Sequence, residues 1–459
     1  MLRRTSSDGT RPAPFIPPPD IDRSALSPTN EPHRANLDDA QNSASLEPLT
    51  LIAYEPLDHR DVQAPPLTVV PRPPGGTSTV ERLRDRPGRP HPVFSSPAYH
   101  RLLQSIGAHV ADVAAGPNHG ANADYIAALA GCDPSKVSAC IVAPNGAISS
   151  FGDNTVFTGQ SILKMIILLA ALRHAGLEAV ERAIACLPSD MAFNGPSTVG
   201  LLDNPEAARF ALRCIGPETT TALLEEIWNG GDCRIANASC NLGAIAAAAF
   251  MPGEGGSVGR QALLMRLMAS LGPRRSSVSK VMETAHRIHG SELLDTAGNQ
   301  LRARVVLHLL GSVLPAEFDR PLQAFQLMQG YIAACALSTD VSNLAAAFSA
   351  FVTGENVFTG ERVVDADHAR FIREQMRVGG LYEKSLAFFE RTGLVAKSGV
   401  GGGIVAICPA TGLTIAVHAS HIDPVGNSTR GMALLERIAS SPELLAVRRA
   451  CNENHHVPP

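Results

Sequence analysis

Ser161 and Lys164 are the pair of residues in this 459-residue chain whose types and spacing point most directly to covalent chemistry. They lie in the run F-T-G-Q-S-I-L-K-M-I-I-L-L, residues 157–169, where a polar Gln-Ser step opens an apolar segment with helical character. Positions i and i+3 of a helix share one face, so the hydroxyl and the amine would point the same way. A desolvated, uncharged lysine can take the proton of a serine and make it a nucleophile. The same residues also fit a plain helix start with a snorkelling lysine.

A second polar motif, Lys397-Ser398-Gly399, lies far downstream and is followed by a glycine run at 401–403. The order S-x-x-K then K-[ST]-G resembles the serine β-lactamases and penicillin-binding proteins, in which both elements accompany a serine nucleophile. The glycines could equally form a flexible loop. A phosphate-binding P-loop is a poorer alternative, because no G-K-[ST] follows the glycines.

Strand and helix patterns flank both motifs. Residues 137–142 and 146–151 predict a hairpin through an Asn-Gly turn, directly before the segment that carries Ser161. Downstream, V-A-I-C-P and T-I-A-V-H predict two strands joined by a Pro-Ala-Thr-Gly turn. Apolar residues recur with helical spacing in 99–113 and 123–130. The two motifs are therefore expected beside one antiparallel sheet.

Composition excludes several classes of protein. A net charge of −4 and a pI near 6.4 give no general electrostatic reason to bind nucleic acid or an anionic membrane. No uncharged apolar stretch reaches the ~18 residues that a membrane span needs, and the first residues lack the apolar core of a Sec signal. Nine cysteines without a C-x-x-C pair fit reduced thiols better than disulfides or a zinc site. We expect a soluble, cytoplasmic protein.

Residues 1–96 differ in kind from the rest, since they hold 17 of the 34 prolines among Ser, Thr, Asp and Arg. Such a segment buries too little apolar surface to offset its ordering entropy, and we expect a disordered Pro/Ser-rich leader. The leader could be a tether, or an export or partner-binding signal outside the Sec route. Residues 97–445 would form the catalytic domain, with a helical subdomain at about 165–375, and 446–459 a flexible tail.

Further blocks follow in a fixed order along the chain. They are A-D-Y-I-A-A-L-A (123–130), S-S-F-G-D (149–153), F-T-G-Q-S-I-L-K (157–164), L-P-S (187–189), F-N (193–194), N-L-G-A-I (241–245), S-E (291–292), N-V-F-T-G (356–360), G-L-Y-E (380–383), 393–404 and D-P-V-G-N-S (423–428). In these blocks the chain is similar to the serine-dependent glutaminases, whose fold is β-lactamase-like. The resemblance covers about residues 99–440 and implies the same fold.

The resemblance also implies roles for the reacting groups. Ser161 matches the nucleophile and Lys164 its base, while Tyr382 matches a tyrosine near the serine that can pass protons to the leaving ammonia. Val400 matches the residue whose backbone N–H joins that of Ser161 in the oxyanion hole. Amide hydrolysis by acyl transfer needs these groups in any fold: a nucleophile, a base that later acts as acid, and donors for the developing oxyanion.

A second set of matching residues would hold the substrate. Asn241, Glu292, Asn299 and Tyr331 match residues that bind the α-amino and α-carboxylate groups of glutamine, and Tyr125 matches a further contact. A carboxylate suits the substrate ammonium, and amide and hydroxyl donors suit its carboxylate. Taken singly, Asn241 could instead be a helix N-cap, Glu292 and Asn299 solvated positions two helical turns apart, and Tyr331 a half-buried packing residue, as could Tyr382.

The chain departs from the family pattern at several supporting positions. The family usually has Arg where this chain has Gly298, Cys where it has Gly379, Pro where it has Val395, and E-P-S-G where it has L-P-S-D. Two stretches look longer than in compact relatives, 195–232 and the segment between Asn299 and Tyr331. These insertions would flank the proposed cleft and could change the substrate or the partner.

The expected architecture is an α/β protein of the α+β type, with a β-lactamase/penicillin-binding-protein-like antiparallel sheet flanked by helices. The expected reaction is hydrolysis of L-glutamine to L-glutamate and ammonia, with no cofactor and no metal, in a homodimer or homotetramer. Two alternatives stay open: a relative that acts on another γ-amide or acyl substrate, and a catalytically silent member that binds a partner.

Overall fold

The computed structural model describes residues 92–124, 127–153, 155–188, 198–199, 232, 234–252, 256–272, 331, 335 and 337–455. The predicted leader lies outside these residues, apart from its last few positions. So do nearly all of the two predicted insertions. Among the described helices, none combines the length and the apolar character that crossing a bilayer requires.

An antiparallel five-stranded sheet with the order β2-β1-β7-β6-β5 forms the centre of the described fold. Its strands are β1 (Ser138–Val142), β2 (Ile148–Gly152), β5 (Val395–Ser398), β6 (Gly403–Ile407) and β7 (Thr414–His418). Two hairpins meet where β1 pairs with β7, with Ser138 opposite His418 and Val142 opposite Thr414. The antiparallel sheet made from both predicted strand pairs is confirmed.

Both hairpin turns use a glycine in the left-handed region. Gly146 has φ 83° and donates its N–H to the carbonyl oxygen of Ala143 at 2.9 Å, which closes the β1–β2 turn. Gly412 has φ 73° and donates to the carbonyl oxygen of Cys408 at 2.8 Å in the β6–β7 turn. Glycine adopts such a φ without a steric penalty, so these local signals fix the strand pairing.

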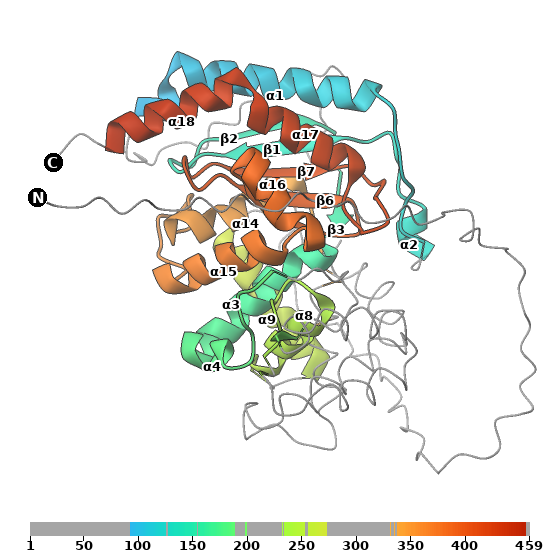
Figure 1. Ribbon diagram of the computed structural model, residues 1–459, viewed down its shortest axis with the longest axis vertical. Helices are drawn as coiled ribbons and strands as arrows, with labels where there is room; N and C mark the ends of the chain where they lie inside the picture. Colours follow the sequence, from blue (N-terminus) through green and yellow to red (C-terminus); the bar gives the residue numbers. More distant parts are fainter. Residues whose placement is uncertain are drawn as a thin grey trace, which may run out of the picture. The chain divides into compact units, whose positions relative to one another are not determined.

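One face of the sheet is covered by the two ends of the described chain. Side chains such as Ala139, Ile141, Ile415 and Val417 point into a core shared with three helices. These helices are α1 (Pro97–Ala115), α17 (Thr429–Ser440) and α18 (Pro442–His455), which lie together along one side of the sheet in Figure 1. The α1 helix begins at its N-cap Ser96, whose side chain accepts from the Tyr99 N–H.

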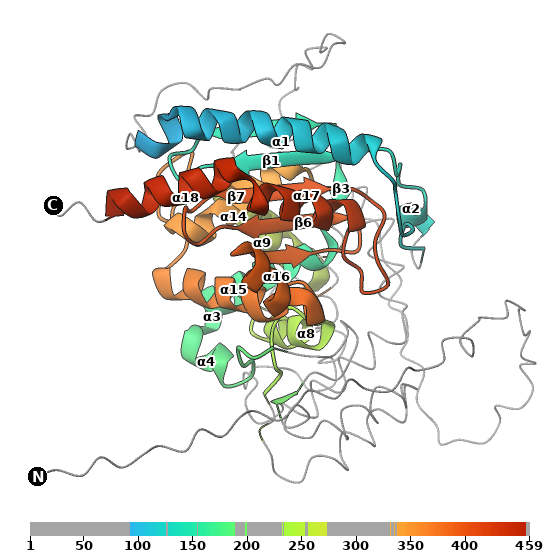
Figure 2. The same cartoon turned by 45° about the horizontal axis from the view of Figure 1, so that its top comes forward.

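The opposite face carries the alternate residues of the same strands, among them Cys140, Val405 and Ala416. They pack in a second core against α14 (Val341–Thr353), which lies under β1, β6 and β7. Figure 2 shows α14 on the side of the sheet away from α1. Asp340 caps the start of α14, and Gly354, with φ 74°, ends it.

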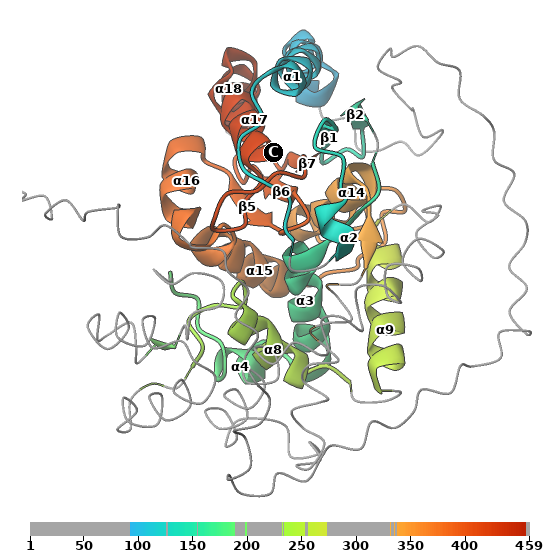
Figure 3. The same cartoon turned by 90° about the vertical axis from the view of Figure 1, so that its right-hand side faces the viewer.

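A helical part continues from this second core. Its central helix is α3 (Lys164–Ala175), in which residues 164–172 are all buried against surrounding helices. The neighbours with which α3 makes its contacts are α4 (Leu177–Glu181), α8 (Asn241–Ala249), α9 (Gly256–Leu271) and α15 (Ala366–Gly379). Figure 3 shows α3 extending away from the sheet with α8 and α9 on either side.

The remaining described elements are short. They are η2 (Pro92–Ser95), α2 (Ala127–Ala130), β3 (Phe157–Thr158), η3 (Gln160–Leu163), β4 (Ser338–Thr339), η6 (Tyr382–Lys384) and α16 (Ser385–Thr392). The strands β3 and β4 pair with each other, apart from the main sheet. The first, β3, leads into η3, which contacts β5 and β6 of the main sheet as well as α3.

The mixed α/β class, with an antiparallel sheet flanked by helices, is confirmed. Two local predictions are wrong. The helix expected to open at the Gln160-Ser161 step begins later, because residues 160–163 form a 3-10 turn in which Gln160 has a left-handed φ of 46°, and the α-helix starts at Lys164. The predicted flexible tail begins too early, because α18 extends to His455 and buries Val447 and Cys451 against the first core.

Candidate active site

Ser161 and Lys164 lie where the 3-10 turn η3 passes into α3. In a 3-10 helix, residues three apart eclipse one another, so both side chains leave the backbone on the same side. Ser161 is 7% exposed and Lys164 is fully buried. The predicted sharing of one face therefore holds, although the first of the two residues precedes the α-helix.

The Lys164 amine is held by oxygen acceptors from the start of α8. Its Nζ donates to the carbonyl oxygen of Ser239 at 3.1 Å and to Asn241 Oδ1 at 2.5 Å. Tyr331 donates its hydroxyl to the same Asn241 oxygen at 2.8 Å. A lysine acts as a base only through an uncharged amine, and full burial favours that form. The arrangement is compatible with an uncharged Lys164 acting as a base.

Asn241 does not serve as the helix cap that its sequence position allowed. The N-cap of α8 is Cys240, whose Sγ accepts from the Gly243 N–H at 3.2 Å. Asn241 is the first residue inside the helix, and its side chain turns to Lys164 and Tyr331. Because two donors face this one atom, the carbonyl end of the amide is the end that points at them.

Tyr382 lies beside Ser161 from the opposite direction. It has φ 57°, an uncommon conformation for a tyrosine, and its ring is buried. Burial raises the pKa of Tyr382 to about 12, although the nearby Ser161 and Ser398 hydroxyls work against this rise. The phenol thus keeps its proton at neutral pH and faces the serine as a donor or proton carrier.

A second buried lysine, Lys397, lies behind the tyrosine. Its Nζ donates to the carbonyl oxygens of Gly380 at 3.2 Å and Ser398 at 2.8 Å, and lies 4.7 Å from the Tyr382 ring centroid. A ring face favours a cation. A fully buried site, however, disfavours the charged form of the amine. The pKa of Lys397 is well below its usual value, mainly because of burial and to a smaller extent because of the nearby Lys164.

The glycine-rich segment after β5 lies directly against η3. A Cβ added to Gly399 would lie 2.5 Å from the carbonyl oxygen of Gly159, and one added to Gly401 would lie 2.7 Å from that of Thr158. Residues 399–402 are all buried. The alternative of a flexible loop is therefore wrong: the glycines allow two backbones to meet.

Val400 lies within this contact, at a turn of fixed orientation. The Gly402 N–H donates to the carbonyl oxygen of Gly399 at 2.9 Å. The Gly399 carbonyl and the Val400 N–H belong to one planar peptide and point in opposite directions. The turn thus directs the Val400 N–H away from Gly402, as a backbone donor for a bound oxyanion requires.

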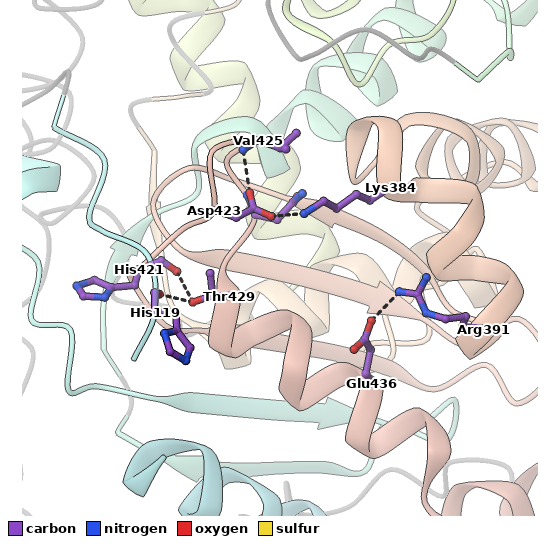
Figure 4. A network of polar contacts seen from close by, with 9 residues as sticks. His119, Lys384, Arg391, His421, Asp423, Val425, Thr429 and Glu436 are labelled. Carbon is purple, nitrogen blue, oxygen red and sulfur yellow. Dashed lines mark hydrogen bonds and ion pairs between the residues drawn. The ribbon is translucent and has the colours of Figure 1, made fainter. Parts of the chain in front are cut away.

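The rim beside Val400 is tied to the segment that carries Tyr382. Asp423 accepts from Lys384 Nζ at 2.6 Å through one carboxylate oxygen, and through the other from the N–H groups of Val425 and Asn427 at 3.0 and 2.9 Å. Figure 4 shows this contact between the two segments. The neighbouring Gly426 comes so near Val400 that a Cβ there would lie 3.0 Å from Val400 Cγ1.

The structure thus gathers six of the predicted site residues at the junction of sheet and helices: Ser161, Lys164, Asn241, Tyr331, Tyr382 and Val400. Tyr125, Glu292 and Asn299 lie outside the described residues, as does Gly298. The geometry shown here provides a serine hydroxyl, a buried amine, a buried phenol and a backbone donor, which are the groups of an acyl-transfer site.

The sequence motif did not predict that the side chains of Lys397 and Ser398 lie near Tyr382. The K-S-G signal placed two polar residues on a strand, and in the buried strand β5 the Lys397 amine lies near the Tyr382 ring while the Ser398 hydroxyl lies near its phenol. Two thiols, Cys240 and Cys335, also lie in this region, where burial raises the pKa of each. No local pattern marked either cysteine.

Comparison with known proteins gives one consistent family. The family model described as glutaminase matches residues 120–226 and 213–445. A glutaminase from Salmonella arizonae is 31% identical over 321 residues, which are 70% of this chain and 90% of that protein. A glutaminase from Corynebacterium glutamicum is 26% identical over 320 residues, 69% of this chain, and the match spans 66% of that longer protein.

Solved structures agree with the sequence matches. The probable glutaminase ybaS superposes with a TM-score of 0.59 at 26% identity, covering 75% of this chain and 97% of that chain. The structure of Mglu in its glutamate form has a TM-score of 0.59 at 27% identity, covering 76% of this chain and 69% of that chain. The predicted β-lactamase-like fold is confirmed by these neighbours.

Proposed function

Because the chain belongs to the glutaminase family, we propose that it hydrolyses L-glutamine to L-glutamate and ammonia through an acyl-enzyme on Ser161. The proposal is supported most by one observation, the position of Ser161 in the turn at the start of the helix that carries the fully buried Lys164 amine, and beside the buried Tyr382 phenol. An isolated serine near a lysine would be an ordinary helix start. A serine between a buried phenol and a buried amine has proton carriers on both sides.

In the proposed first step, Lys164 Nζ takes the Ser161 proton while Oγ attacks the γ-carbonyl carbon. The tetrahedral intermediate collapses as its C–N bond breaks, and the departing nitrogen receives, by way of Tyr382, the proton that Lys164 had taken, so that ammonia leaves and Lys164 is again uncharged. Water then attacks the ester, giving its proton to the same base, and Ser161 leaves with a proton to release glutamate. No other reactant is needed, and each group returns to its starting protonation state.

The intermediate needs donors for its oxyanion. We propose the N–H groups of Ser161 and Val400, since the glycine-rich turn lies against the backbone of Gly159 and directs the Val400 N–H outward. In other acyl-transfer enzymes, the loss of one such donor raises the barrier by roughly 3 to 4 kcal/mol.

For substrate binding we propose Asn241 and Tyr331 on the substrate α-carboxylate, with Glu292, Asn299 and Tyr125 completing the site. Asn241 and Tyr331 already bond each other beside Lys164, so a substrate that contacts them is placed next to the base. The related Mglu was solved in a glutamate form, which supports a ligand of this chemistry. We also propose a homodimer or homotetramer and a cytoplasmic location, which light scattering and cell fractionation test.

The proposal is tested by measuring ammonia and glutamate released from L-glutamine by the purified chain. Equal amounts of both products, lost in Ser161→Ala at unchanged thermal stability, are the expected result. A folded protein without turnover would leave the partner-binding alternative. Faster release from another γ-glutamyl amide in a substrate panel would replace glutamine as the substrate while keeping the chemistry.

A further inference from the structure

His418 ends β7 directly below the glycine-rich turn, and no step described so far uses it. Its side chain is 2% exposed, and its ring stacks on Phe157 with centroids 4.2 Å apart and planes at 12°. Its Nε2 lies 3.1 Å from the carbonyl oxygen of Gly401. Gly401 follows Val400, so this contact holds the turn that carries the proposed oxyanion donor.

The direction of this hydrogen bond can be assigned. A carbonyl oxygen only accepts, so Nε2 must carry the hydrogen. Burial lowers the pKa of His418 to about 4, which keeps the ring neutral at physiological pH and leaves Nδ1 without a proton. Among the described residues Nδ1 has no partner. Nothing there favours the other tautomer, which would break the contact with Gly401.

The turn is fixed from three directions. The Gly399 N–H donates to the carbonyl oxygen of Gly403 at 2.9 Å, and the Ala419 N–H donates to that of Gly402 at 3.1 Å. The Gly402 N–H closes the turn on Gly399. These backbone bonds hold its two ends to β6 and β7, whereas the His418 side chain holds its middle through Gly401.

We propose that His418 is a positioning residue for amide hydrolysis, which sets the orientation of the Val400 N–H by holding the Gly401 carbonyl. This inference rests on the proposed function. An apolar ring at this position would stack on Phe157 equally well but would leave the Gly401 carbonyl without its donor. The two peptides flanking Gly401 could then rotate, because glycine restrains neither φ nor ψ.

A purely structural histidine makes a different prediction. Its loss would lower stability and would not change how well a folded enzyme stabilises the transition state. A positioning residue for an oxyanion donor affects kcat while leaving KM nearly unchanged, since the substrate carbonyl gains its charge only in the transition state. Steady-state kinetics on folded variants separate the two.

The test uses His418→Phe, which keeps the stacked ring, and His418→Gln, which keeps an N–H near the place of Nε2. We expect His418→Phe to lower kcat roughly tenfold or more with KM within about twofold, and His418→Gln to recover part of that loss. The matched control is Thr414→Val, an isosteric change on the same face of β7, opposite Ile407 and away from the turn. It should keep the original kcat.

Amide hydrogen exchange gives a second readout that needs no activity. In His418→Phe, the amides of Gly402 and Ala419 should exchange about tenfold faster, and in Thr414→Val they should not change. Unchanged kcat or unchanged exchange in His418→Phe would overturn the inference, as would an equal loss in Thr414→Val. If the original protein does not hydrolyse glutamine, the proposed function fails, and exchange alone decides whether His418 holds the turn.

Discussion

At the scale of single residues, backbone strain gathers at the candidate site. Among the described residues, the non-glycine positions with a left-handed φ are Gln160 and Tyr382, at 46° and 57°. One precedes Ser161, and the other faces its hydroxyl. Such conformations cost about 1 to 3 kcal/mol each and persist where the surroundings determine them. Their place beside the same hydroxyl supports a function for this region beyond packing.

His418 gives a prediction for the dependence of stability on pH. Its pKa is near 6.5 when exposed and about 4 when folded, so between these values the unfolded chain binds more protons. The free energy of unfolding therefore rises with pH across this window, is fully gained above about 6.5 and is lost toward pH 4. The difference corresponds to about 3 kcal/mol. Urea unfolding at pH 4.5 and 7 measures it, and His418→Phe should remove that part of the slope. An unchanged slope in the variant would contradict this assignment.

One departure from the family pattern has a physical explanation at this scale. A Cβ added to Gly379 would lie 2.5 Å from Asn237 Oδ1, and one added to Gly243 would lie 2.0 Å from the Asn237 carbonyl oxygen. Asn237 also accepts from the Ser239 N–H at 3.1 Å, and Ser239 in turn holds Lys164. Position 379 must therefore be glycine while the Asn237 side chain lies against it. Sequence patterns taken one position at a time could not reveal this contact.

At the scale of elements, the turn 399–402 and the η3 segment act as one unit. The two are more than 200 residues apart in the sequence, and their backbones meet through glycines. This explains which elements were predictable. The hairpins depend on local signals such as Asn145-Gly146, which a sequence displays. The glycine-rich turn at 399–402 is typical of a flexible loop in the sequence, and only its contact with Thr158 and Gly159 in the fold shows why glycines are needed there. The helix was predicted to open at the Gln160-Ser161 step instead of at Lys164, because residue types alone do not show the left-handed φ of Gln160.

This close approach predicts the effect of Gly399→Ala. The new methyl would lie 2.5 Å from the Gly159 carbonyl oxygen, so the turn or η3 must shift. We expect kcat to fall roughly a hundredfold, as for the loss of an oxyanion donor. The matched control is Gly131→Ala, where an added Cβ has no neighbour within 4 Å. Equal kcat in both variants and the original protein would contradict the close approach.

At the scale of the whole described fold, the candidate site lies where three distant parts of the sequence meet. Tyr382 and Ser398 come from the segment around the edge strand β5, Ser161 from the turn before α3, and Asn241 from the start of α8. The resemblance to a known family predicted these site residues together, because members of a family share the fold that brings such residues to one place. The residues alone predicted the pairing of Ser161 with Lys164, and they could not place Lys397 or His418, whose partners are set by the sheet.

The C-terminal helix is part of this fold rather than an appendage. Leu444 and Val447 are fully buried and Cys451 nearly so, in the core shared with α1. Leu444, Val447 and Cys451 have the i, i+3, i+7 spacing of a helix with one apolar face, so this signal was already present in the sequence. Ending the chain after Ser441 should lower the free energy of unfolding by roughly 5 kcal/mol, from the exposure of three buried side chains. Thermal unfolding measures the loss, with a chain ending after His455 as control. Equal unfolding temperatures of the two chains would contradict this prediction and would mean that α18 does not unfold together with the rest of the fold.

The central claim is that Ser161 carries the acyl group and Lys164 activates it. Acid quenching during turnover of L-glutamine, followed by peptide mass spectrometry, tests this most directly. The account predicts a γ-glutamyl ester on the peptide that contains Ser161, absent in Ser161→Ala and in Lys164→Ala. Ammonia release at the original rate by Ser161→Ala, or an adduct on a different residue, would contradict it.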